Sequence, residues 1–83
     1  MTIQFSPELV EVFPLYLGMT LRRFVKSNNF KYSLAYMSYV TNGHRPVTQE
    51  FNTELNRIFK QYDLDFTDLE NMYALVELIE SGS

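Results

Sequence analysis

The sequence predicts an all-α fold, a compact domain of four to five short helices. Hydroxyl residues that can cap a helix precede apolar runs at five places, which are Ser6, Thr20, Ser33, Thr48 and Thr67. Within these runs the apolar residues recur three and four positions apart, which is the spacing of one helix face. The chain has 83 residues, so we expect a single domain, residues 1–83, whose core is only just large enough for stability.

The first helix is expected to begin after Ser6, because Pro7 suits the first helical position and Glu8 suits the positive end of a helix. Pro14 has no backbone N–H to donate to the carbonyl one turn earlier. The first helix should therefore be short, or bent before Gly18.

The second helix is expected to begin after Thr20 and to end at Ser27-Asn28-Asn29, whose short polar side chains compete for backbone hydrogen bonds. Arg22 and Arg23 lie in its first turn, where the positive end of the helix dipole disfavours cations. They indicate either a nearby anion such as phosphate, or an exposed face that only aids solubility.

The third helix is expected between Ser33, which can cap it, and Asn42-Gly43, which can end it. Pro46 follows soon afterwards and cannot rejoin a helical hydrogen-bond ladder without losing a bond. We therefore predict a short helix followed by a turn and a basic loop that contains Arg45.

The fourth helix is expected to begin after Thr48 and is the clearest amphipathic segment. Its apolar stripe is assigned to the core and consists of Phe51, Leu55, Ile58, Phe59 and Tyr62. Glu54 and Arg57 lie three positions apart on the outer face, where such a pair contributes roughly 0.2–0.5 kcal/mol.

A final helix is expected over about 67–80, after a link at 63–66. Thr67 and Glu70 have the spacing of a capping box, in which each side chain accepts a backbone N–H of the other. The helix is apolar over a wide face, so it either closes the core or pairs with a second copy. Residues 81–83 are expected to form a flexible tail.

Charge is divided unevenly along the chain, whose net charge is −3. Residues 1–48 carry five Lys or Arg and two acids, a net +3, whereas residues 49–83 carry two and eight, a net −6. A basic half attracts polyanions and an acidic half repels them, which would orient the chain on nucleic acid. The alternative is a pair of solvated faces with no partner.

The sequence contains no pattern typical of an enzyme, a metal site or a cofactor site. There is no Cys and His44 is the single His, so no metal-ligand spacing exists. Asp63, Asp65 and Asp68 lack the Gly and the final Glu of a calcium loop. There is also no phosphate-binding Gly-rich loop and no nucleophile with a plausible His partner. No apolar run approaches membrane-spanning length and no leader pattern occurs, so we expect a cytoplasmic protein with no membrane partner.

An ordered set of features runs from Thr20 to Phe66. A capping Thr is followed four and five positions on by an apolar pair, then by a capped helix, an Asn-Gly and a basic residue; these are Thr20, Phe24, Val25, Ser33, Met37, Ser38, Val40, Asn42, Gly43 and Arg45. In this set, which covers more than half of the chain, the sequence resembles the lambda repressor and Cro family of helix-turn-helix proteins of phages and mobile elements. The turn between Val25 and Ser33 departs from the family pattern, because it is slightly longer and lacks the customary Gly.

The resemblance implies a compact lambda-repressor-like helix-turn-helix fold and a transcription regulator that binds duplex DNA. The DNA-binding set that it implies is Thr20, Arg22, Arg23, Ser33, Tyr36, Tyr39, Asn42 and Arg45. The three arginines would hold phosphates, while the two tyrosines would meet bases. Proteins of this kind commonly use two copies on a two-fold operator. A homodimer is therefore expected through the last helix, with the contacting residues Leu69, Met72, Val76 and Ile79.

The third helix also supports a different function. Its expected outward residues are mainly apolar, namely Leu34, Ala35, Tyr36 and Tyr39. Direct readout of bases uses paired donors and acceptors, so these residues predict modest sequence discrimination, or a protein partner in place of DNA. The alternative is a protein-binding module on the same scaffold, an antirepressor or an inhibitor of a DNA-binding protein, with no DNA binding of its own.

Overall fold

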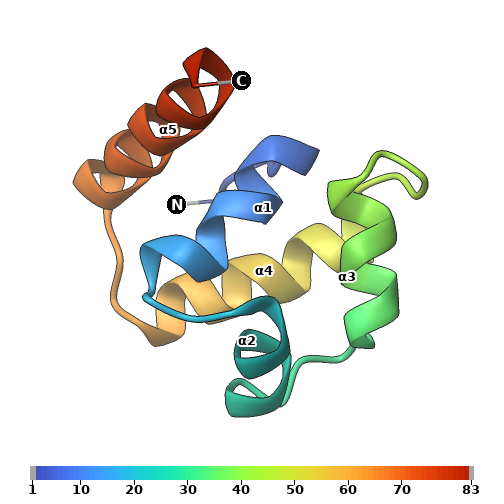
Figure 1. Cartoon of the computed structure of the whole chain (residues 1–83). Helices are drawn as coiled ribbons and strands as arrows, with labels where there is room; N and C mark the ends of the chain where they lie inside the picture. The colour runs from blue at the N-terminus through green and yellow to red at the C-terminus, as the bar shows by residue number, and fades with distance from the viewer. Residues whose placement is uncertain (1, 83) are drawn as a thin grey trace.

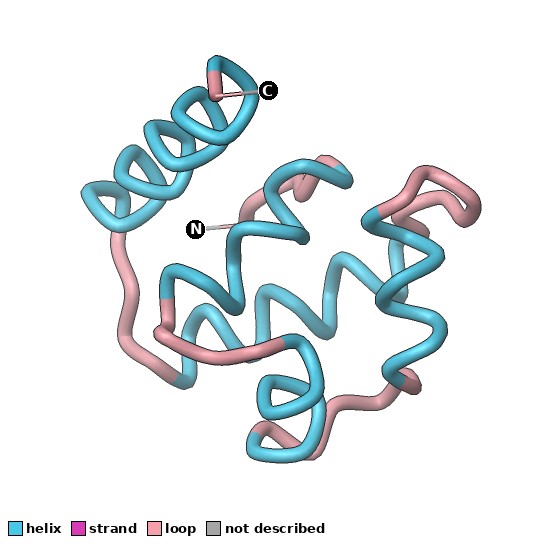
Figure 2. Tube along the Cα trace, in the orientation of Figure 1, coloured by secondary structure: helices cyan, strands magenta, loops and turns pink. Residues whose placement is uncertain are grey.

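A computed structural model describes residues 2–82 and shows an assembly of α-helices (Figure 1). The helices are α1 (Pro7–Tyr16), α2 (Leu21–Ser27), α3 (Leu34–Thr41), α4 (Gln49–Gln61) and α5 (Phe66–Ser81). Loops and turns join them, and no strand occurs within residues 2–82 (Figure 2). The predicted all-α class is confirmed. Met1 and Ser83, which belong to the predicted domain and tail, lie outside the described residues, and Ser81 ends α5 instead of beginning a tail.

Four predicted helix starts are confirmed by their capping hydrogen bonds. The side-chain hydroxyl of each cap accepts the backbone N–H three residues on, at 3.1 or 3.2 Å; the caps are Ser6, Thr20, Ser33 and Thr48. Each bond satisfies a backbone donor that a helix leaves unpaired at its start. Pro14 was expected to shorten or bend the first helix; it lies inside α1, which continues two residues beyond it and ends at Tyr16, before Gly18.

The start of α5 differs from the prediction of a capping box at Thr67 and Glu70. Asp65 is the cap, and its Oδ1 accepts the backbone N–H groups of Thr67 and Asp68 at 3.0 and 3.2 Å. The Asp68 Oδ2 accepts the Asp65 N–H at 2.9 Å, which completes the box. A carboxylate both accepts these bonds and is attracted to the positive helix end, so with Asp65 as the cap the helix begins two residues earlier than it would with Thr67.

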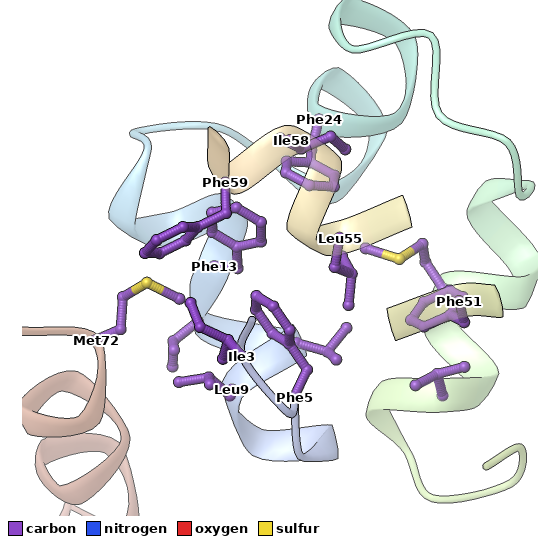
Figure 3. Packing of buried hydrophobic residues seen from close by; sticks show 14 of the residues in the cluster. Ile3, Phe5, Leu9, Phe13, Phe24, Phe51, Leu55, Ile58, Phe59 and Met72 are labelled. Atoms are coloured by element: carbon purple, nitrogen blue, oxygen red, sulfur yellow. The ribbon is translucent and has the colours of Figure 1, made fainter. Parts of the chain in front are cut away.

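Aromatic side chains make up much of the core. Six of the seven Phe are buried, and these are Phe5, Phe13, Phe24, Phe30, Phe51 and Phe59. The Phe13 ring centroid lies 5.4 Å from that of Phe5, 5.3 Å from Phe24 and 6.1 Å from Phe59 (Figure 3). Such tilted and edge contacts are favourable between rings. The predicted stripe of α4 is confirmed as core, with Tyr62 half-buried at its end.

The segment before α1 is extended and is bound to α4 by two buried asparagines one turn apart. The Asn56 Oδ1 accepts the Ile3 N–H at 2.8 Å, and its Nδ2 donates to the Ile3 carbonyl at 2.8 Å. The Asn52 side chain accepts the Phe5 N–H and donates to the same Ile3 carbonyl, both at 2.8 Å. These bonds satisfy buried backbone groups of a segment that has no strand partner, while the Ile3 and Phe5 side chains enter the core.

The helix α1 lies between α5 on one side and α2 and α3 on the other (Figure 1). The Tyr16 hydroxyl, at the end of α1, donates to the Asp68 Oδ1 at 2.6 Å near the start of α5. This bond lowers the pKa of Asp68 below its ordinary value and raises the pKa of Tyr16. At the other end, Glu8 of α1 lies beside Ile79 of α5, so the two helices are antiparallel.

Candidate nucleic-acid interface

The exposed face of α2 is basic. Phe24 is fully buried and anchors the helix, while Arg22, Arg23 and Lys26 are exposed. The arrangement follows from the sequence, because the cations fall on the helix face opposite to Phe24. No described residue makes an ion pair with these three cations. They are therefore available to an anion in solvent.

The turn between α2 and α3 is held in place by α4. Arg57 donates to the Asn28 carbonyl at 3.1 Å, and the Glu54 Oε2 accepts the Lys31 N–H at 2.8 Å. Arg57 and Glu54 are themselves paired, with Nε to Oε1 at 2.6 Å. The sequence predicted only a weak surface pair here. In the structure the pair connects α4 to the turn, which sets the position of α3 relative to α2.

The pair makes the stability of the domain depend on pH. The hydrogen bond from Arg57 holds the pKa of Glu54 below its ordinary value, against the opposing effect of partial burial. The stabilisation is therefore present above the unfolded pKa of about 4.3 and is lost as pH falls through the folded pKa. Glu54→Gln removes the charge that pairs with Arg57, so we expect it to lower the free energy of unfolding at pH 7. The loss should be only about 1 kcal/mol, because Arg57 is partly exposed and solvent weakens the pair.

Urea unfolding of wild type and Glu54→Gln at several pH values measures this effect. The difference between them should shrink as the pH approaches 3. Glu70→Gln is the control, because Glu70 is an exposed acid of α5. A difference that is constant with pH, or equal for both variants, would show that the Glu54 charge does not hold the turn.

The exposed face of α3 is narrower than expected. Ala35, Tyr39 and Asn42 are exposed and lie four and three positions apart, so they share one face, while Met37 and Val40 are fully buried opposite to them. This face carries a methyl group, a phenol and an amide. Asn42 follows the last residue of α3, where its backbone N–H caps the helix end.

Tyr36 is not an outward residue as the sequence pattern predicted. Its ring is half-buried and stacks on Tyr32 with centroids 4.8 Å apart, and it lies 5.5 Å from the ring of Phe51. The ring face is therefore used in packing. Leu34 is half-buried as well, so of the four expected outward residues Ala35 and Tyr39 are the exposed ones.

The loop after α3 presents Arg45, the third arginine of the predicted phosphate-binding set. Gly43 has a φ of 79°, a left-handed conformation that favours glycine. The backbone N–H groups of His44 and Arg45 both donate to the Tyr39 carbonyl, at 2.8 and 3.2 Å. Tyr39, His44 and Arg45 line an open hollow of about 320 Å³. The side chains around it can donate hydrogen bonds to an anion.

The predicted DNA-binding residues are thus distributed along one pair of helices. The turn after α2 leads into the first end of α3, and the loop with Arg45 leaves its other end (Figure 1). Thr20 and Ser33 use their hydroxyl oxygens as helix caps, which leaves each hydroxyl hydrogen able to donate. In the chain, exposed cations therefore precede α3 in α2 and follow it at Arg45.

The predicted dimerisation residues are mostly used within the chain. Met72 is fully buried and Leu69 is nearly so, and both belong to the chain's own core. Val76 packs partly against that core, whereas Ile79 is 42% exposed. Leu69 and Met72 are therefore removed from the predicted contact surface, because a buried side chain cannot touch a second copy of the folded chain.

Within residues 2–82 there is no group of three or more His, Asp or Glu side chains that could hold a metal ion. No helix in that span is long and apolar enough to cross a membrane. Comparisons of the chain with protein-family models, curated proteins and solved structures found no match.

Proposed function

We propose that this chain is a DNA-binding transcription regulator of the lambda repressor and Cro type, in which α2 and α3 act as a helix-turn-helix. The observations that support the proposal are the exposed face of α3, formed by Ala35, Tyr39 and Asn42, and the exposed cations of the elements that precede and follow α3 in the chain. A helix that enters the major groove meets base edges on such a face and phosphates on either side.

The proposed roles follow from the chemistry of each group. Arg22, Arg23 and Arg45 contact phosphates, which are the main source of affinity for duplex DNA. Asn42 can pair with an adenine edge, and the Ala35 methyl can contact a thymine methyl. Tyr39 adds one hydroxyl and an apolar ring. With a single amide on this face, sequence discrimination is modest, and affinity depends mainly on charge.

The salt dependence of binding tests the phosphate contacts. We expect the wild-type chain to bind a mixed-sequence duplex at low salt, measured by fluorescence anisotropy of labelled DNA. Each phosphate contact contributes about 0.9 to the slope of log affinity against log salt. Arg22→Ala/Arg23→Ala should therefore weaken binding and reduce the slope by about 2.

Two single variants supply a matched comparison. Arg45→Ala and Lys60→Ala each remove one exposed cation, from the loop after α3 and from α4 respectively. The first should reduce the slope by about 1 and the second should leave it unchanged. Equal slopes for the wild type and Arg22→Ala/Arg23→Ala would contradict the phosphate assignment. Absence of duplex binding by the wild type at low salt would contradict the proposed function.

A further inference from the structure

The exposed large apolar side chains of the described residues gather on two helices. Five of the six belong to α1 or α5, and these are Leu15, Phe66, Tyr73, Leu78 and Ile79. Scattered apolar residues are ordinary on a protein surface, but a concentration on one pair of helices is typical of an interaction site. Of these two helices, α5 lies on the side of α1 away from α2 and α3 (Figure 1).

The same two helices carry acids and no basic residue. Glu8 and Glu11 lie in α1, and α5 contributes four more, which are Asp68, Glu70, Glu77 and Glu80. Neither helix contains Lys, Arg or His. Glu8 and Glu11 belong to the part of the sequence with net positive charge. In the structure, however, they lie next to the acidic helix α5.

A small groove lies where the acidic and apolar residues meet. Val12 of α1 and Val76 and Ile79 of α5 supply its apolar lining, and Glu8, Glu11 and Glu80 its acidic lining. The groove is small, with a volume of about 30 Å³. Ile79 is still 42% exposed, so a partner could extend the apolar contact over the groove.

The acidic residues of α1 and α5 indicate which kind of partner can bind this groove. Two copies of this face would place acids against acids, and like charges at short range oppose association. Nucleic acid and anionic lipid are repelled for the same reason. We propose that the groove between α1 and α5 docks a basic amphipathic helix of another protein, whose apolar side chain contacts Val76 and Ile79 while its Lys or Arg residues pair with Glu8 and Glu11.

The docking site is independent of the proposed DNA surface. Because α5 and α3 pack on opposite sides of α1, both surfaces can be occupied together. The recognition mode is that of an amphipathic helix in a groove, with charge pairs at the rim fixing its register. Peptide binding is measured without DNA, so failure of one proposal does not affect the other.

The test uses a synthetic helical peptide of repeating Leu-Lys-Lys-Leu, titrated into the isotope-labelled full chain and followed by NMR amide shifts. We expect shifts concentrated in α1 and α5. A peptide of the same composition with alternating Leu and Lys has no apolar helix face, and should bind more weakly. Glu8→Gln/Glu11→Gln should weaken binding by about 2- to 30-fold, the range given by two exposed ion pairs.

Glu50→Gln/Asp63→Asn is the matched control. It also removes two exposed acids, but from α4 and the link after it, and should bind the peptide as the wild type does. Equal weakening by both double variants would overturn the proposal, as would shifts spread over the whole chain. A dimer in sedimentation experiments that Ile79→Lys abolishes would identify the occupant as a second copy and would also overturn it.

Discussion

Phe13→Ala is expected to destabilise the domain by about 3–5 kcal/mol, the usual result of truncating a fully buried Phe. The Phe13 ring contacts those of Phe5, Phe24 and Phe59, so its removal leaves a cavity that borders α2, α4 and the N-terminal segment. A domain of 83 residues has a total stability of roughly 4–12 kcal/mol. The variant should therefore be marginally folded or unfolded at room temperature.

Urea unfolding followed by far-UV circular dichroism measures this loss. Phe66→Ala is the matched control, since it makes the same chemical change at a side chain that is 61% exposed. It should change the free energy of unfolding by no more than about 0.5 kcal/mol. A loss below about 1 kcal/mol for Phe13→Ala, or equal losses for both variants, would contradict the position of Phe13 at the centre of the core.

The second large effect is expected from Asn52→Ala/Asn56→Ala. This change leaves the buried N–H groups of Ile3 and Phe5 without acceptors, and each unsatisfied group costs about 1–3 kcal/mol. The total loss should be about 2–6 kcal/mol, unless the segment leaves the core and exposes its two apolar side chains. Either result lowers the free energy of unfolding.

Hydrogen exchange distinguishes loss of the clamp, by which Asn52 and Asn56 bind the N-terminal segment, from general destabilisation. The amide protons of Ile3 and Phe5 should be protected in the wild type, because Asn56 and Asn52 accept them. In the double variant they should exchange faster than the amides of α4. Asn71→Ala is the control, since Asn71 is exposed and makes a single long bond of 3.4 Å to Tyr16. Rapid exchange at Ile3 and Phe5 in the wild type would refute the clamp.

Local features of the sequence predicted the helices well. The caps Ser6, Thr20, Ser33 and Thr48 act on residues three positions away, so their effect depends on neighbours that the sequence shows directly. The predicted cap of α5 was wrong because two possible capping boxes overlap there. Asp65 with Asp68 and Thr67 with Glu70 have the same spacing, and the carboxylate cap is the one used.

Long-range contacts could not be predicted in the same way. Asn52 and Asn56 were expected on no particular face, and their partners lie about fifty positions earlier in the chain. Their i and i+4 spacing at the edge of an apolar stripe indicates two polar side chains on one helix face that can bind the same backbone segment. The spacing does not predict which segment they bind. The position of Glu8 and Glu11 beside α5 has the same cause, since it depends on the antiparallel packing of two helices.

The candidate site was predicted only in part. The exposed cations of α2 and the basic loop follow from helix periodicity and from the Asn42-Gly43 turn. Tyr36 was assigned outward because α3 is short and nearly every residue in it is apolar or aromatic, so periodicity alone does not select the buried face. Its stacking on Tyr32 depends on the turn before α3, whose conformation is held by α4.

The clamp on the N-terminal segment also has a consequence for biosynthesis. Ile3 and Phe5 are synthesised before Asn56, which is added about 3–11 s after Ile3 at a rate of about 5–20 residues per second. Helical domains of this size complete folding within milliseconds once their contacts are available. The nascent chain therefore holds two uncovered apolar residues during that interval, and the segment can dock only when α4 has emerged.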